Sequence, residues 1–492
     1  MRESGILMHI TSLPAPYGIG TMGKDAYAFV DFLVRAGQRY WQILPLTPTG
    51  YGDSPYQSLG ACAGNHYLID LDRLADEGLL KKEEIQNISW GSNPARVDFG
   101  AMYAHRMNVL RLAFQRFAPD EAYETFVEQN RSWLEDYALF TALKDTLGGK
   151  PWLEWPEALR LRKADALTEK RRELSDEIRL QYFVQYEFDR QWKALRSYAN
   201  AKGVRIIGDV PIYVPLDSAD VWANPELFQL DESRHPEQVA GCPPDSFTAD
   251  GQLWGNPIYD WKKMAQTHYF WWIQRLTAAG KLYDVIRLDH FRGFESYWSV
   301  PAGDTTARNG KWVKGPGMDF IHTIQQALPN LEFIAEDLGF ITPEVRKLQQ
   351  DSGYPGMKVL EFAFDSREES DYMPHLYPVD SVCYTGTHDN VTLKQWFDEA
   401  APEDVACAKT YLGLNREEGY IRGMIRGCMG SVSRLCVVQM QDYLELGKEA
   451  RMNFPGTLSS ANWTWRAEKG FDSDALAARI YAATKLYGRV GK

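Results

Sequence analysis

Carboxylate residues follow several short apolar runs in this sequence, and their positions predict a shared chemical site. These residues are Asp209, Asp289, Glu336 with Asp337, Asp365 and Asp389. Gathering like charges is electrostatically costly because each carboxylate raises the pKa of its neighbours, so the stability of a fold does not call for it. One acidic strand end is explained as a helix cap, whereas five on one rim indicate a functional site.

Two chemistries use such a cluster of carboxylates. Metal-assisted reactions take hard oxygen ligands, usually with histidine for a transition metal, whereas glycosidic-bond chemistry takes a carboxylate nucleophile and a protonated carboxylic acid. Arg287 lies two residues before Asp289, so both side chains point to the same side of a strand. A guanidinium there would keep Asp289 ionised and oriented. Because the sequence has no HExxH or His/Asp ligand pattern, we expect no metal and favour glycoside chemistry by Asp289 and Glu336.

Eight short apolar runs, each ending in a polar or turn residue, predict the strands that position these carboxylates. The runs span residues 5–10, 40–46, 204–210, 283–290, 331–338, 357–365, 381–389 and 434–443. Their near-continuous apolar character is typical of parallel strands covered on both faces. Helix-like spacing occurs between them, as in residues 26–33, 263–280 and 319–330. Eight strands that alternate with helices predict an α/β fold, a (β/α)8 TIM barrel whose active site lies at the carboxyl ends of the strands.

Two intervals are too long for simple crossovers and predict large insertions into one catalytic barrel that spans residues 1–492. Residues 47–203, between strands two and three, carry helical patterns and predict a largely helical insertion. Residues 211–282, between strands three and four, are rich in Pro, Gly and Trp and predict a loop-rich insertion. Both intervals leave from strand ends where barrel active sites are built.

Composition and charge narrow the class of protein without identifying a substrate. The net charge of −12 makes nucleic acid an unfavourable partner, because binding phosphates needs a basic face. No stretch approaches the ~20 apolar residues that span a bilayer, and the first residues lack the pattern of a secretion signal. The six cysteines show no metal-ligand spacing and are expected to be reduced, buried thiols. We therefore expect a cytoplasmic protein with no membrane or nucleic-acid partner.

Four short motifs, with their flanking segments, match a known family. The motifs are GDVPIYV, VIRLDHFRG, IAEDLG and GTHDN, on the third, fourth, fifth and seventh predicted strands. In this order on a barrel they are highly specific, and the chain resembles, from end to end, the 4-α-glucanotransferases (amylomaltases) of glycoside hydrolase family 77, in the α-amylase superfamily. The resemblance implies transfer of a segment of an α-1,4-glucan (maltodextrin, starch or a glycogen-derived glucan) to the 4-hydroxyl of an acceptor. It implies a retaining double displacement through a covalent glucosyl-aspartate, with no cofactor.

The resemblance also assigns roles to individual residues. It implies that Asp289 is the nucleophile, that Glu336 is the general acid and base, and that Asp389 stabilises the transition state. Arg287 would orient Asp289. The other substrate contacts that it implies are His290, His388, Tyr56, Asp209, Asp245, Trp254, Asp365 and Asn462. Asp245 and Trp254 lie in a segment similar to the family's mobile lid.

Structural roles explain some nearby residues equally well. Asp365 is expected to cap a helix as readily as to bind a sugar. Trp463 and Trp465, which follow Asn462 closely, are at least as compatible with a position in the core.

Three functions stay open on the residues alone. An α-glucan hydrolase of the same clan differs from a transferase only in whether water or sugar resolves the covalent intermediate. A non-catalytic glucan-binding barrel is disfavoured because Asp289, Glu336 and Asp389 are all present. The residues themselves support retaining glycoside chemistry, and the step from cutting to transferring rests on the family resemblance.

Overall fold

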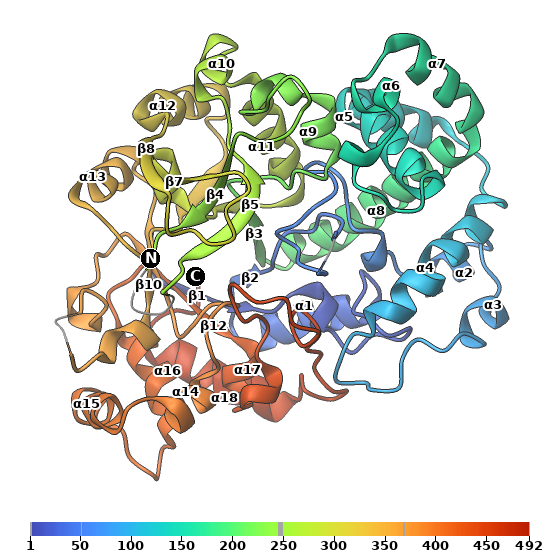
Figure 1. Ribbon diagram of the computed structural model, residues 1–492. Helices are drawn as coiled ribbons and strands as arrows, with labels where there is room; N and C mark the ends of the chain where they lie inside the picture. Colours follow the sequence, from blue (N-terminus) through green and yellow to red (C-terminus); the bar gives the residue numbers. More distant parts are fainter. Residues whose placement is uncertain (1, 51, 245–248, 368–369, 492) are drawn as a thin grey trace.

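Eight parallel strands close into a barrel at the centre of the protein, in the spatial order β1-β12-β11-β10-β9-β6-β3-β2 (Figure 1). The computed structural model describes residues 2–50, 52–244, 249–367 and 370–491. The barrel strands are β1 Glu3–Leu7, β2 Tyr40–Gln42, β3 Arg205–Val210, β6 Val285–Leu288, β9 Glu332–Ala335, β10 Gly356–Val359, β11 Ser381–Tyr384 and β12 Leu435–Gln439. The predicted (β/α)8 barrel is confirmed, and each strand lies within or beside one of the predicted runs.

The strands are shorter than the apolar runs that predict them, because the last residues of the runs leave the barrel as loops or helical turns. β6 ends at Leu288 and β9 at Ala335, so Asp289 and Glu336 are the first residues beyond two neighbouring strands. β10 ends at Val359 and is followed by a 3₁₀ helix, Leu360–Phe364. The prediction that Asp365 ends the sixth strand is therefore wrong, because the apolar run continues through a helical turn that hydrophobicity alone does not distinguish from a strand.

Helices follow most of the barrel strands and cover their outer faces (Figure 1). α1 (Lys24–Arg35) buries Phe29, Val30 and Leu33 on one face and gives way to Gly37, whose φ of 70° suits a residue without a side chain. The later helices are α12 Gly317–Ala327, α13 Pro343–Ser352, α14 Leu393–Glu399, α15 Pro402–Leu412, α16 Tyr420–Gly430, α17 Met440–Tyr443 and α18 Asp474–Leu486. No helix of the described residues is both long and apolar enough to cross a membrane.

The interval between β2 and β3 is built mainly from helices, which lie beside the barrel at the right of Figure 1. They are α2 Leu71–Asp76, α3 Lys82–Gln86, α4 Phe99–Phe114, α5 Glu121–Thr146, α6 Glu157–Arg160, α7 Ala164–Glu173 and α8 Ser175–Ala201. α8 packs against α5 and runs back to the start of β3. Although α8 is rich in charged residues, one face of it is buried and includes Leu180, Phe183, Phe188 and Trp192.

A four-stranded antiparallel sheet, in the order β5-β4-β7-β8, stands beside the carboxyl ends of β3 and β6. β4 (Gln238–Cys242) and β5 (Gln252–Pro257) come from the interval after β3, which also holds α9 Ala219–Ala223, α10 Trp261–Gln266 and α11 Phe270–Leu282. β7 (Ser296–Pro301) and β8 (Lys311–Lys314) follow β6. The sequence pattern does not predict this sheet, because its short strands mix Gly, Lys and Pro with apolar residues. Its central pair, β4 with β7, also joins segments more than 50 residues apart.

Candidate active site

Arg287 joins two of the predicted carboxylates at the barrel rim. It lies beside Asp209 in the register of β3 and β6. Its Nη1 donates to Asp209 Oδ2 at 2.7 Å and to Asp289 Oδ1 at 2.8 Å, and its side chain is 4 % exposed. Burial would lower the pKa of Arg287, but the two carboxylates outweigh burial and raise it well above its ordinary value. Arg287 is therefore a fixed cation that contacts Asp289, as their spacing predicts.

Asp289 keeps its charge at neutral pH although it is surrounded by protein. Burial raises its pKa to about 6, with contributions from the charges of Asp209 and Asp389, and Arg287 opposes this rise. Its side chain is 26 % exposed, so the carboxylate remains open to a ligand. An ionised, oriented and accessible carboxylate has the properties of a nucleophile.

Glu336 lies against the chain that leaves β6. Its Oε2 accepts from the main-chain N–H of His290 at 2.6 Å, and its Oε1 accepts from that of Leu338 at 3.0 Å. Burial and the charge of Asp289 raise its pKa to about 8, with Arg287 opposing. The proton is therefore favoured on Glu336 and the negative charge on Asp289. This division of protonation is what an acid and a nucleophile on one glycosidic bond require.

His290 adopts the left-handed conformation, with φ 50° and ψ 47°, which is unusual for a residue with a side chain. This turn points its N–H at Glu336. Its ring meets the ring of Trp254, on β5, edge to face at 4.8 Å. Burial lowers the pKa of His290 to about 3, so its imidazole is neutral. The antiparallel sheet thus reaches the site through Trp254.

Asp389, on the loop after β11, is held by residues far along the chain. Asn453 Nδ2 donates to its Oδ1 at 2.7 Å, and Arg451 donates to its main-chain oxygen at 2.9 Å. His388 Nε2 lies 3.4 Å from the same carboxylate, whose side chain is 44 % exposed. The sequence does not predict these contacts of Asn453 and Arg451, because no motif or spacing links the two residues to the seventh strand.

Tyr56 connects the first insertion to the rim. Its hydroxyl donates to Asp209 Oδ2 at 2.8 Å, and its ring stacks on that of His388 at 5.1 Å. Trp463 completes this aromatic group, with its ring centre 5.8 Å from that of Tyr56. The sequence allows a core position for Trp463, and the structure shows that it is buried. It also lies beside Tyr56 and His388 at the edge of the site.

Three other predicted site residues have different surroundings. Asp365 pairs with Arg367, whose Nε donates to it at 2.8 Å, and this pairing lowers the pKa of Asp365 to about 2. Asn462 accepts from the N–H of Phe454 and donates to the main-chain oxygen of Thr457, so its amide shapes its own loop. Asp245 lies outside the described residues.

Glu361 lies in the 3₁₀ helix that directly follows β10, the sixth barrel strand. It is therefore closer to the end of this strand than Asp365, the residue predicted there. It is 8 % exposed, and its Oε1 has no hydrogen-bond partner among the described residues. Burial raises its pKa well above the ordinary value, and so does the charge of Asp442, while Arg451 opposes them. Arg451 therefore lies between Glu361 and the Asp389 loop.

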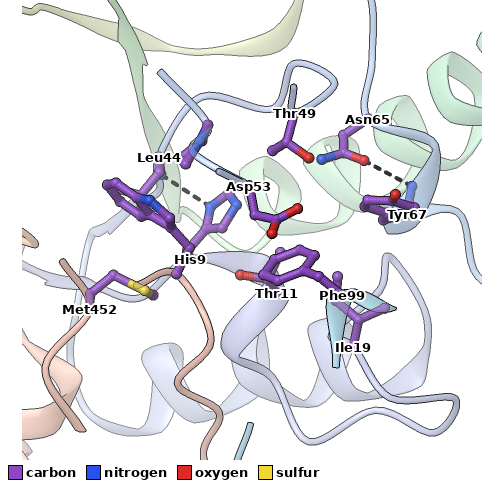
Figure 2. A pocket seen from close by; sticks show the side chains of 12 residues that line it. His9, Thr11, Ile19, Leu44, Thr49, Asp53, Asn65, Tyr67, Phe99 and Met452 are labelled. Carbon is purple, nitrogen blue, oxygen red and sulfur yellow. Dashed lines mark hydrogen bonds between the residues drawn. The ribbon is translucent and has the colours of Figure 1, made fainter. Parts of the chain in front are cut away.

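A cavity lies next to the site, between the end of β1 and the loop that follows β2 (Figure 2). His9, which accepts from the N–H of Leu44, and Trp463 are among its lining residues. Figure 2 also shows Asp53, Thr49 and Tyr67 turned toward this space. Burial lowers the pKa of His9 to about 3, with a further contribution from the nearby His388.

Comparison with known proteins gives one consistent result. The glycoside hydrolase family 77 model, described as 4-alpha-glucanotransferase, matches residues 8–472. A 4-alpha-glucanotransferase of Clostridium butyricum is 48 % identical over 486 residues, covering 98 % of this chain and all of that protein. One of Thermus thermophilus is 48 % identical over 502 residues, covering 99 % of each chain.

Solved structures agree with these sequence matches. The amylomaltase of Streptococcus agalactiae, in complex with acarbose, superposes with a TM-score of 0.97 at 43 % identity, covering 99 % of this chain and 100 % of that one. The amylomaltase of Corynebacterium glutamicum shares the fold at 18 % identity, with a TM-score of 0.79 over 98 % of this chain and 75 % of that one. The chain therefore belongs to the 4-alpha-glucanotransferase family, glycoside hydrolase family 77.

Proposed function

We propose that this enzyme moves a segment of an α-1,4-glucan to the 4-hydroxyl of a second glucose or glucan by a retaining double displacement. One observation carries the mechanism: Arg287 holds Asp289 beside Glu336, and the pKa of Glu336, about 8, exceeds that of Asp289, about 6. An ionised nucleophile and a protonated acid are then present together at neutral pH.

In the first displacement, Asp289 attacks the anomeric carbon of the glucan. Its Oδ1 is held by Arg287, which leaves Oδ2 to form the new bond. As the bond from the anomeric carbon to the glycosidic oxygen breaks, Glu336 gives its proton to that oxygen. The reducing-end fragment leaves as a neutral alcohol, and the rest of the glucan is bound to Asp289 as a β-linked ester.

In the second displacement, Glu336 acts as a base. Its carboxylate takes the proton of the acceptor's 4-hydroxyl, and that oxygen attacks the anomeric carbon while the ester bond breaks. Two inversions restore the α configuration, Glu336 is reprotonated, and Asp289 is free again. Asp289 forms and then loses the ester bond, and Glu336 gives one proton to the leaving oxygen and regains one from the acceptor, so every proton and bond is accounted for.

The surrounding residues stabilise the sugar during both displacements. We assign Asp389 to hydroxyls of the reacting ring, since Asn453 and His388 hold its carboxylate and it remains accessible. Positive charge develops on the ring as the bond breaks, and this anion favours it. The neutral rings of His290 and His388 are placed to bind hydroxyls, and Tyr56 and Trp254 give aromatic faces on two sides of the rim.

The family relatives and the acarbose-bound amylomaltase favour α-glucans as the substrate class.

Incubation of the purified enzyme with maltotriose tests this function. We expect glucose together with maltodextrins longer than maltotriose, at a constant total of reducing ends. A rising total of reducing ends, with shorter products only, would identify a hydrolase instead. Unchanged maltotriose, with retained binding, would identify a non-catalytic glucan-binding barrel.

A further inference from the structure

Three cysteines converge at a buried point outside the active site. Cys383 on β11 and Cys436 on β12 are paired in the barrel register, and Cys428 lies on α16, the helix that covers them. All three side chains have 0 % exposure, and their sulfur atoms lie within 4.8 Å of one another. Cys436 Sγ is 3.5 Å from Cys428 Sγ. The three sulfur atoms are therefore close together in space, although the spacing of the cysteines in the sequence matches no metal-binding motif.

A buried cation without a carboxylate partner lies beside these cysteines. Arg489 has 0 % exposure, and its guanidinium donates to main-chain oxygens of Glu3, Met429, Ser431 and Ser433. Within the described residues it makes no ion pair. A buried charge without an opposite charge is costly, so the nearby thiols are the groups that can neutralise it.

The hydroxyl of Ser431 links this cation to the sulfurs. Ser431 Oγ lies 3.5 Å from Arg489 Nη2 and 3.2 Å from Cys383 Sγ. Burial raises the pKa of Cys383, but hydrogen bonds from Cys428 and Cys436 and the charge of Arg489 bring it well below its ordinary value. Ser431 therefore connects Arg489 with the cysteine cluster through two side-chain contacts.

We propose that Cys383, Cys428 and Cys436 form a three-thiolate site for one thiophilic divalent cation of the zinc type. Zinc–sulfur bonds of about 2.3 Å place three ligand sulfurs roughly 3.8–4.0 Å apart. The observed spread of up to 4.8 Å needs only small side-chain adjustments to reach this geometry. Ser431 Oγ, beside Cys383, is within reach as a fourth, neutral ligand.

Charge balance favours a divalent ion. When the cation enters, three sulfur–metal bonds form and each thiol that becomes a ligand gives up its proton to solvent. Three thiolates around an M²⁺ ion carry a net charge of −1, and the buried guanidinium of Arg489 offsets it.

The alternative is that the three cysteines are only small apolar residues that pack between barrel and helix. That alternative explains their burial, but it leaves the unpaired charge of Arg489 unexplained. A bound ion would tie β11, β12 and α16 together.

Cadmium, a zinc-like ion with a sulfur-to-metal absorption band, is a direct probe. The full-length protein is prepared with Cys62, Cys242 and Cys407 replaced by serine, so that only the cluster offers thiols. We expect one Cd²⁺ per chain by native mass spectrometry, the ultraviolet charge-transfer band of cadmium thiolate, and release of protons as the thiols bind the ion. We also expect a higher Tm, because an ion that binds only the folded state stabilises it.

Cys428→Ala and Cys436→Ala, made in the same background, should each lose the absorption band and the metal-dependent rise in Tm. Circular dichroism checks that each variant folds. If either variant is unfolded, zinc content decides: the parent protein, expressed in zinc-supplemented medium, should carry one zinc ion per chain. Absence of cadmium and zinc from the folded parent, or cadmium uptake that a folded alanine variant retains in full, would overturn the proposal in favour of apolar packing.

Discussion

Arg287 donates one hydrogen bond from Nη1 to Asp289 and holds that carboxylate at 2.8 Å. The same nitrogen contacts buried Asp209 at 2.7 Å, so the nucleophile's partner is itself fixed from the neighbouring strand. This arrangement offsets the desolvation of Asp289 and keeps its pKa below that of Glu336.

Replacing Arg287 by Lys should slow the reaction strongly. A lysine keeps the charge but cannot hold both carboxylates with the geometry of a guanidinium. Losing one charge-assisted hydrogen bond, about 1.5–3 kcal/mol, corresponds to a fall of roughly 10- to 100-fold in kcat. The acidic limb of the pH profile should also move to higher pH, because Asp289 loses part of its stabilisation. Arg434→Lys is the matched control, since its pair with Asp380 is exposed; an equal loss in both variants would contradict the specific role.

The pH dependence of kcat/KM should be bell-shaped. Activity needs Asp289 ionised, so it rises as pH increases through about 6, and it needs Glu336 protonated, so it falls as pH increases through about 8. These apparent values belong to the interacting pair. Glu336→Gln should lose the alkaline limb with an α-maltosyl fluoride donor, whose fluoride leaves without a proton. Persistence of that limb in the variant would assign it to another group.

Asn453→Ala should impair turnover more than binding. Asn453 fixes the Asp389 carboxylate at 2.7 Å, and an anion that stabilises the developing charge on the sugar acts mainly in the transition state. We expect kcat to fall about 10-fold or more, with KM for maltodextrin little changed. Asn309→Ala, which removes an exposed contact with Asp304, serves as the control. A rise in KM at constant kcat would mean that Asn453 supports only binding.

The protonated carboxyl of Asp442 should stabilise the fold, so that the free energy of unfolding falls as pH rises and this group loses its proton. Burial raises its pKa in the folded protein to about 7, whereas the unfolded value is about 3.9. Its stabilising contribution is therefore complete below pH of about 4 and is lost as pH rises toward 7. Relative to the parent protein, Asp442→Asn should gain about 2 kcal/mol of stability between pH 5 and 7.5, measured by denaturant unfolding. Asp380→Asn, at an exposed site, should show no such gain.

The contact between Arg287 and Asp289, the proposed nucleophile, could be predicted from the sequence because it is local. The two residues are two positions apart, at the end of β6 and directly after it, so the alternation of side chains along a strand predicts that they lie on the same side. The barrel could be predicted for a similar reason, since parallel strands covered on both faces appear as apolar runs. The four motifs then identified the family, which the comparisons confirm.

Other parts of the site depend on contacts between distant segments. Asn453 and Arg451 hold Asp389 from a loop that follows β12, and Trp254 reaches His290 from the antiparallel sheet. Glu361 takes the place expected for Asp365 because β10 ends early and a 3₁₀ turn redirects the chain.

By itself, the sequence determined the barrel, the order of its strands along the chain and the family, and it pointed to Asp289, Glu336 and Asp389 as the candidate carboxylates. The tertiary structure decided their protonation, because the pKa of a carboxyl depends on burial and on charges from neighbouring strands. It also decided which residues support Asp389 and which cysteines meet. These relationships arise only when the barrel closes, since closure brings the ends of β3, β6, β9 and β11 onto one rim and β11, β12 and α16 into one layer.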